Sequence, residues 1–167
     1  GGINYFDLGA GNAGIFPVYG EALADVRTDV FYQIHFGAVY PGDGSYARSY
    51  DYDEVMRTVE RVLKDVRTDY IDYCFASCLD EFSEWDEYKR NGLLERMCKL
   101  KDEGIVHHIA LSTHTPAIGQ DIMDDVDIDM LMFSINPAYD YGEGGDYARG
   151  GVDERAELMR RCEAEGV

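Results

Sequence analysis

The chain has 167 residues, of which 46% are hydrophobic, and its formal net charge is −18. This length and hydrophobic content suit one domain with a sizeable core. So acidic a surface repels phosphate backbones, which argues against a nucleic-acid-binding protein. No apolar run reaches the roughly 18–20 residues needed to cross a bilayer, so no membrane partner is expected.

Short apolar runs alternate with stretches of helical periodicity along the chain. In chain order they predict a strand at 3–6, a helix at 20–26, a strand at 30–36, a helix at 53–66, a strand at 70–75, a loop at 80–88, a helix at 93–100, a strand at 106–111, a helix at 116–123, a strand at 130–135, a glycine-rich loop at 142–151 and a helix at 153–165. Asp51 is a plausible cap for the helix at 53–66, and Glu54 completes a capping-box spacing.

The alternation of strands and helices predicts an α/β protein with about five parallel strands, because the strands are too apolar for an exposed antiparallel sheet. A doubly wound sheet and a barrel both fit this order. Similar helix lengths favour the barrel, as do the polar residues that follow the strands, namely Asp7, His35, Ser77, Ser112, Thr113, His114 and Asn136. A barrel needs eight strands. We therefore expect residues 1–167 to form a single incomplete (β/α)8 barrel domain, truncated at both ends.

One G-x-G-x-x-G pattern follows the first predicted strand, at Gly9, Gly11 and Gly14. A lone match of this kind is unspecific, and no well-formed helix is predicted to begin within it. The acidic residue expected about 20 positions later has only Asp25 and Asp29 as candidates. A Rossmann-type phosphate loop is therefore the less favoured interpretation.

The four cysteines lack a C-x-x-C spacing and make no recognised zinc pattern with the four histidines. Cys74 and Cys78 are expected on one face of a strand, as buried thiols of a reduced, cytoplasmic protein. His107 and His108 alternate across a strand without a third convergent ligand, so no metal site is expected. His114, in a loop at the predicted barrel mouth, is either a functional residue or an exposed loop histidine.

Four stretches carry a resemblance to a known family: residues 2–7 (GINYFD), 20–23 (GEAL), 67–72 (RTDYID) and 106–112 (VHHIALS). In order, they resemble the second strand, the helix after it, the entry to strand four, and strand five of the aldo/keto reductase superfamily. Residues 33–37 and 133–140 are similar to a divergent branch that often carries a C-terminal iron–sulfur domain. The resemblance implies hydride transfer between NADPH or NADH and a small-molecule carbonyl substrate, and an iron–sulfur cluster beyond residue 167.

The family's catalytic set is a tyrosine proton donor, a lysine and an aspartate that tune it, and a histidine that orients the carbonyl. Asp7 matches the aspartate. Asn12 stands where the tyrosine is expected, His35 where the lysine is, and Ser77 where the histidine is. Asparagine has no ionisable proton, whereas histidine titrates near neutral pH. Asp7, Asn12, His35 and Ser77 are therefore the candidate catalytic residues, with His35 as proton donor and Asp7 raising its pKa by proximity.

The candidate cofactor-binding residues are Ser112, Thr113 and Asn136. Ser112 matches the strand-five serine that contacts the nicotinamide, whereas Thr113 replaces the asparagine after it and Met132 replaces a glutamine of strand six. Tyr19, seven residues after Asn12, either packs in the core, which is favoured, or enters the site.

Three hypotheses follow. The first is a nicotinamide-dependent oxidoreductase of the aldo/keto reductase type with a modified catalytic site. The second is a non-catalytic barrel that binds a ligand or a partner, because tyrosine, lysine and histidine are all replaced. The third is a fragment without a stable function of its own, because five strands leave two open edges.

Overall fold

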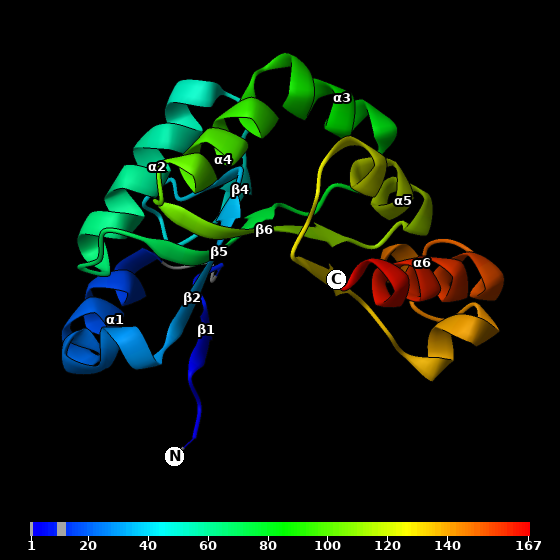
Figure 1. The fold of residues 1–167 in the computed structure, drawn as a ribbon, viewed down its shortest axis with the longest axis horizontal. Helices are drawn as coiled ribbons and strands as arrows, with labels where there is room; N and C mark the ends of the chain where they lie inside the picture. Colours follow the sequence, from blue (N-terminus) through cyan, green and yellow to red (C-terminus); the bar gives the residue numbers. More distant parts are fainter. Residues whose placement is uncertain (1, 10–12) are drawn as a thin grey trace.

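The computed structural model describes residues 2–9 and 13–167, which build one curled sheet with helices on its outer face (Figure 1). All neighbouring strands of this sheet are parallel, and their spatial order is their order in the chain. The strands are β1 (Tyr5–Asp7), β2 (Phe31–Phe36), β5 (Ile71–Ala76), β6 (Val106–Thr113) and β7 (Met130–Phe133). A short antiparallel hairpin of β3 (Ala38–Val39) and β4 (Ala47–Arg48) follows β2.

The helices form an arc over one face of the sheet, while the concave face carries none of the described helices (Figure 1). They are α1 (Phe16–Ala22), α2 (Tyr52–Asp65), α3 (Phe82–Arg90), α4 (Leu93–Asp102), α5 (Pro116–Asp125) and α6 (Val152–Glu165). A sequentially ordered, curled parallel sheet with outer helices is part of a (β/α)8 barrel. The barrel interpretation is confirmed, and the doubly wound alternative is wrong.

The strand register places alternate residues on the two faces of the sheet. On β2, Tyr32, Ile34 and Phe36 are buried in the core. Gln33 and His35 lie on the opposite, concave face. The carboxyl ends of all five strands lie on one rim because the strands are parallel.

The segment after β5 differs from the predicted loop at residues 80–88, because it contains the helix α3. Glu81 and Glu84 form a capping box at its start, and Trp85 and Tyr88 are buried on one side. These two aromatics are three positions apart, so they share a helical face. The predicted loop was wrong because the many acidic residues of this segment outweighed the helical spacing of its two buried aromatics.

Two further local predictions need correction. The first helix begins at Phe16 rather than at residue 20, because Phe16 is fully buried and Pro17 suits a first turn. Asp51 does cap α2, accepting from the Glu54 amide at 2.8 Å. However, the Asp51 amide donates to Ser49 Oγ at 3.2 Å instead of to Glu54, so no capping box forms.

A buried ion pair holds the end of the sheet where the strands begin. The Arg27 guanidinium donates to Asp72 Oδ2 at 2.8 Å and lies over the rings of Tyr32 and Tyr70. Asp72 Oδ2 also accepts from the Tyr32 amide at 2.8 Å, which links β5 to β2. Asp72 is the last residue of the RTDYID stretch, so the structure gives this motif a structural role.

A second carboxylate has the same arrangement between β6 and β7. Asp129 Oδ2 accepts from the Ile109 amide at 2.9 Å and from Lys101 Nζ at 2.7 Å, while Oδ1 lies 3.3 Å from His108 Nδ1. Burial raises the pKa of Asp129, but the hydrogen bonds from Lys101, Ile109 and His108 outweigh it and lower the pKa below its usual value.

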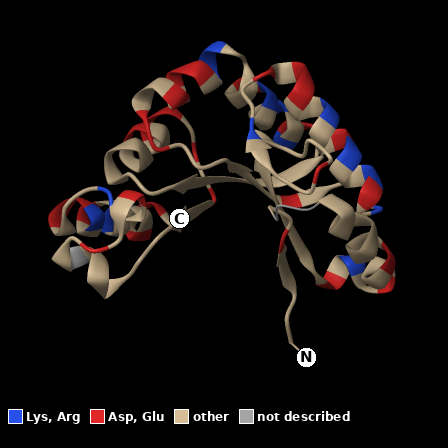
Figure 2. Ribbon diagram, turned by 180° about the vertical axis from the view of Figure 1, so that it is seen from behind, with Lys and Arg blue, Asp and Glu red and all other residues tan. Residues whose placement is uncertain are grey.

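Acidic residues are distributed along the outer helices among lysines and arginines (Figure 2). Within residues 2–9 and 13–167, no helix has both the length and the apolar character required to cross a bilayer.

Candidate functional site

The ends of β1 and β2 bring two of the predicted catalytic residues together. His35 Nε2 lies 3.3 Å from Asp7 Oδ1, with the His35 side chain 14% exposed and the Asp7 side chain 47% exposed. The pair is therefore sheltered on the histidine side and open to solvent on the carboxylate side.

A hydrogen-bonded chain on the concave face supports His35. The Gln33 amide nitrogen lies 3.1 Å from His35 Nε2, and the Tyr5 hydroxyl donates to Gln33 Oε1 at 2.7 Å. A protonated Nε2 donates to Asp7, whereas an unprotonated Nε2 accepts from Gln33. Both protonation states of His35 therefore have a hydrogen-bond partner.

Gly9 closes over this pair. Its amide donates to Asp7 Oδ1 at 2.7 Å, and a Cβ at this position would lie 2.4 Å from His35 Cδ2. Burial raises the pKa of Asp7, but the hydrogen bonds from His35 and Gly9 outweigh it and lower the pKa below its usual value. The first glycine of the G-x-G-x-x-G pattern thus permits close approach to His35.

Asn12 lies outside the described residues, as does Gly11 of the glycine pattern. Tyr19 packs in the core as favoured, with its ring centroid 5.6 Å from that of Phe6.

Ser77 directly follows β5, and Ser112 is the penultimate residue of the neighbouring strand β6, so both lie at the same rim. Ser77 is buried, and its Oγ has no hydrogen-bond partner among the residues that the structure describes. The Leu79 amide donates to the Ser112 carbonyl at 3.0 Å, which holds the segment after β5 against the end of β6. A buried hydroxyl without a partner is costly, so Ser77 Oγ has a hydrogen-bonding position available for a bound molecule.

Two of the three predicted cofactor-binding side chains already have internal partners. Thr113 Oγ1 donates to Asp80 Oδ1 at 3.2 Å and accepts from the Thr115 amide at 3.0 Å. Asn136 is exposed, and its Oδ1 accepts from the Ala138 amide at 2.9 Å, capping a 3-10 turn. Ser112, at 8% exposed, is buried at the end of β6.

The aldo/keto reductase family model matches residues 2–167, essentially the whole chain. The chain belongs to the aldo/keto reductase family. No curated protein matches it significantly.

Solved aldo-keto reductases have the same fold. A Pseudomonas aeruginosa protein assigned to them is 19% identical, with a TM-score of 0.73, over 99% of this chain and 58% of that one. AKR11C1 from Bacillus halodurans, in its holo form, is 20% identical with a TM-score of 0.69, over 99% of this chain and 51% of that one. An enzyme from Klebsiella pneumoniae in complex with NADPH is 19% identical with a TM-score of 0.65, over 99% and 51%. The chain thus spans between half and three fifths of these aldo-keto reductases.

The structure of this aldo/keto reductase family member also shows polar residues that the sequence did not single out. Gln33 is 1% exposed on the concave face beside His35. A glutamine two positions before a histidine within the predicted strand was the available signal, because both side chains point to the same face of a strand.

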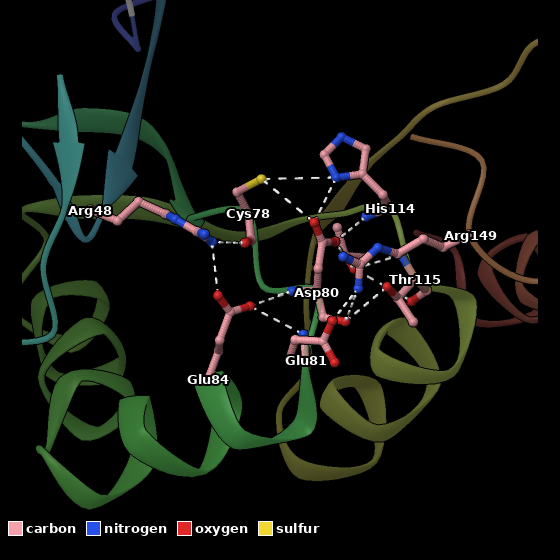
Figure 3. A network of polar contacts seen from close by, with 9 residues as sticks. Arg48, Cys78, Asp80, Glu81, Glu84, His114, Thr115 and Arg149 are labelled. Carbon is pink, nitrogen blue, oxygen red and sulfur yellow. Dashed lines mark hydrogen bonds and ion pairs between the residues drawn. The ribbon is translucent and has the colours of Figure 1, made fainter. Parts of the chain in front are cut away.

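Asp80 was also missed, and it organises the rim between β5 and β6 (Figure 3). Its Oδ2 lies 2.8 Å from His114 Nδ1, and its Oδ1 accepts from the His114 amide at 2.6 Å. His114 is therefore paired and only 18% exposed in its side chain, rather than an exposed loop histidine.

The cysteines differ in part from expectation. Cys74 and Cys162 are buried, whereas Cys78 and Cys98 are partly exposed, and all four are free thiols. Cys78 lies beyond the end of β5 with φ +48°, so it does not share a strand face with Cys74. Burial, followed by the neighbouring Asp80 carboxylate, raises the pKa of the Cys78 thiol.

Proposed function

We propose that the protein is a nicotinamide-dependent oxidoreductase that interconverts small carbonyl compounds and alcohols, with an Asp7–His35 pair in place of the family's usual proton donor. The observation that carries this proposal is the 3.3 Å approach of the two side chains at the strand-end rim. Active sites of (β/α)8 barrels lie at this rim. Membership of the aldo/keto reductase family supports the hydride-transfer chemistry.

In this mechanism NADPH or NADH supplies the hydride, and His35 Nε2 holds the proton that the forming alkoxide needs. The Asp7 carboxylate lies within reach of this Nε2 proton, and the Gln33 amide can donate to the ring nitrogen after the proton has left. The free hydrogen-bonding position of Ser77 Oγ supports a role in orienting the carbonyl oxygen. Ser112 is the remaining candidate for the nicotinamide amide.

We also propose a domain organisation, a cellular location and a class of partner. Residues 1–167 are one incomplete barrel domain of a longer, cytoplasmic protein that acts on small molecules rather than nucleic acid. An iron–sulfur cluster in a following domain belongs to the same proposal, on the resemblance to the branch that carries one.

The test is turnover of full-length protein with NADPH or NADH and a panel of small aldehydes and ketones. Positioned proton donors contribute roughly 100-fold or more to rate, so His35→Gln should lower kcat by about 100-fold. His107→Gln is the matched control, because His107 lies on the opposite face of the sheet, stacked on Tyr70. Unchanged turnover in His35→Gln removes His35 from the mechanism.

A second candidate function is a non-catalytic barrel that binds a ligand or partner. The internal hydrogen bonds of Thr113 and Asn136 favour it, because both side chains are occupied within the chain. Calorimetric titration of full-length protein with NADPH and with NADH separates the two functions. Binding of neither cofactor would support the non-catalytic barrel.

A further inference from the structure

Three side chains of metal-binding type converge just beyond the ends of β5 and β6 (Figure 3). Cys78 Sγ lies 3.9 Å from both Asp80 Oδ2 and His114 Nδ1, and these two atoms are 2.8 Å apart. We propose that Cys78, Asp80 and His114 bind a single divalent transition-metal ion of the zinc class. This inference does not depend on the proposed oxidoreductase function.

The separations suit one shared ion. Zinc binds sulfur at about 2.3 Å and nitrogen or oxygen at about 2.0–2.2 Å, so its tetrahedral ligand atoms lie roughly 3.3–3.6 Å from one another. The observed separations of 2.8 and 3.9 Å lie on either side of that range. Side-chain shifts of roughly half an ångström would bring all three atoms onto one ion.

The chemistry of the three groups selects the class of metal. A thiolate and an imidazole favour zinc and related transition ions, whereas magnesium and calcium take oxygen ligands. Three protein ligands leave the fourth tetrahedral position to water. A simple Asp80–His114 ion pair would not need a thiol, so Cys78 is the residue that distinguishes the metal site from an ion pair.

The surrounding hydrogen bonds orient the three ligands. Asp80 Oδ1 is occupied by the His114 amide and by Thr113 Oγ1, which leaves Oδ2 facing Cys78 and the imidazole. Arg48 donates to the Cys78 carbonyl, and Arg149 donates to the Asp80 carbonyl at 3.2 Å. Such outer contacts fix the ligands before the ion arrives.

The charges near the cluster do not oppose a cation. Arg48 pairs with Glu84 at 3.2 Å, and Arg149 pairs with Glu81, so both guanidinium charges are compensated locally. The Asp80 and His114 side chains are 15% and 18% exposed, which shelters the position while leaving it accessible. The net charge of −18 also attracts cations to the molecule.

The test is titration of full-length, reduced protein with Zn²⁺, followed by Co²⁺ as a spectroscopic probe. We expect one equivalent of Zn²⁺ to bind and the Co²⁺ form to show thiolate-to-metal charge-transfer absorption. Cys78→Ser should lose that absorption and weaken Zn²⁺ binding by at least about tenfold. Cys98→Ser is the matched control, because Cys98 is another partly exposed thiol, on α4 and outside the cluster.

His114→Gln provides a second, independent variant, with circular dichroism and a thermal melt confirming that each variant folds. It should weaken Zn²⁺ binding to a similar extent as Cys78→Ser. Asp80 is left unchanged because it also holds the rim together through the His114 amide. Zn²⁺ affinity or cobalt absorption that is the same in Cys78→Ser as in the parent would overturn the proposal, as would a parent protein that binds no Zn²⁺.

Discussion

The two ends of the sheet use carboxylates in different ways. At the end where the strands begin, Asp72 and Asp129 each accept from a backbone amide of the neighbouring strand and from a basic side chain. At the end where the strands finish, Asp7 faces a histidine and solvent, and Asp80 faces a histidine and a thiol.

This contrast separates stability from chemistry within one sheet. Asp72 and Asp129 each join two neighbouring strands through a backbone amide and a basic side chain, an arginine or a lysine. Asp7 and Asp80 face a histidine at the rim where active sites of such barrels lie, and there a carboxylate can exchange protons or share a metal ion. Substitutions at the two ends should therefore act on different measurements.

The largest effect is expected at the strand-start end, for Arg27→Ala. It would leave the Asp72 carboxylate buried, at 9% side-chain exposure, without its cation. Breaking one partner of a buried ion pair costs about 3–5 kcal/mol, so the free energy of unfolding in urea should fall by at least about 3 kcal/mol. Arg61→Ala, which removes an exposed pair with Asp65, should cost about 0.5 kcal/mol or less. Equal losses in the two variants would contradict a structural role for this end.

A smaller effect is expected at the strand-end rim, for Gly9→Ala. The added Cβ would lie 2.4 Å from His35 Cδ2 and 2.8 Å from Asp7 Oδ1, so the imidazole must move. We expect kcat to fall about tenfold, equivalent to about 1.4 kcal/mol in the barrier. Gly151→Ala is the control, since its Cβ would make only an ordinary 3.6 Å contact with Glu154. A variant with parental kcat would show that the position of His35 is not critical.

The smallest effect is a pH dependence at Asp129. Because its pKa is lowered in the folded protein, its contribution to stability is present above the unfolded pKa of about 3.9 and is lost as the pH falls through the folded value. Asp129→Asn should therefore cost about 1 kcal/mol at neutral pH, and the difference from the parent should shrink in acid. Chemical denaturation from pH 7 to pH 3 measures this, with the exposed Asp25→Asn as control. A difference that stays constant with pH would exclude the ionised pair as its source.

The strands were predictable because each is a dense apolar run, and their parallel order followed from the intervening helices. The helix α3 was not predictable, because Trp85 and Tyr88 lie among acidic residues, and a polar stretch of this kind is typical of a loop.

Within the candidate site, the Asp7–His35 pair was predictable because both residues lie at the carboxyl ends of adjacent strands. The Cys78–Asp80–His114 cluster was not predictable, because Asp80 and His114 are 34 positions apart in the chain and the β5–β6 pairing brings them together. Gly9 was singled out as part of a phosphate-binding pattern, whereas in the structure its lack of a Cβ leaves room for the His35 imidazole.

The two arginines at the rim make the loop after β5 dependent on distant parts of the chain. Arg48 comes from the hairpin after β2, and Arg149 comes from the glycine-rich segment before α6, yet both hold carbonyls of residues 78–80. A transplant of this loop alone into another barrel would lose both supports. Reproducing the loop geometry in another barrel would require grafting three segments together. Insertions in the hairpin or in the glycine-rich segment would displace Arg48 or Arg149, and the loop would then change although its own sequence had not.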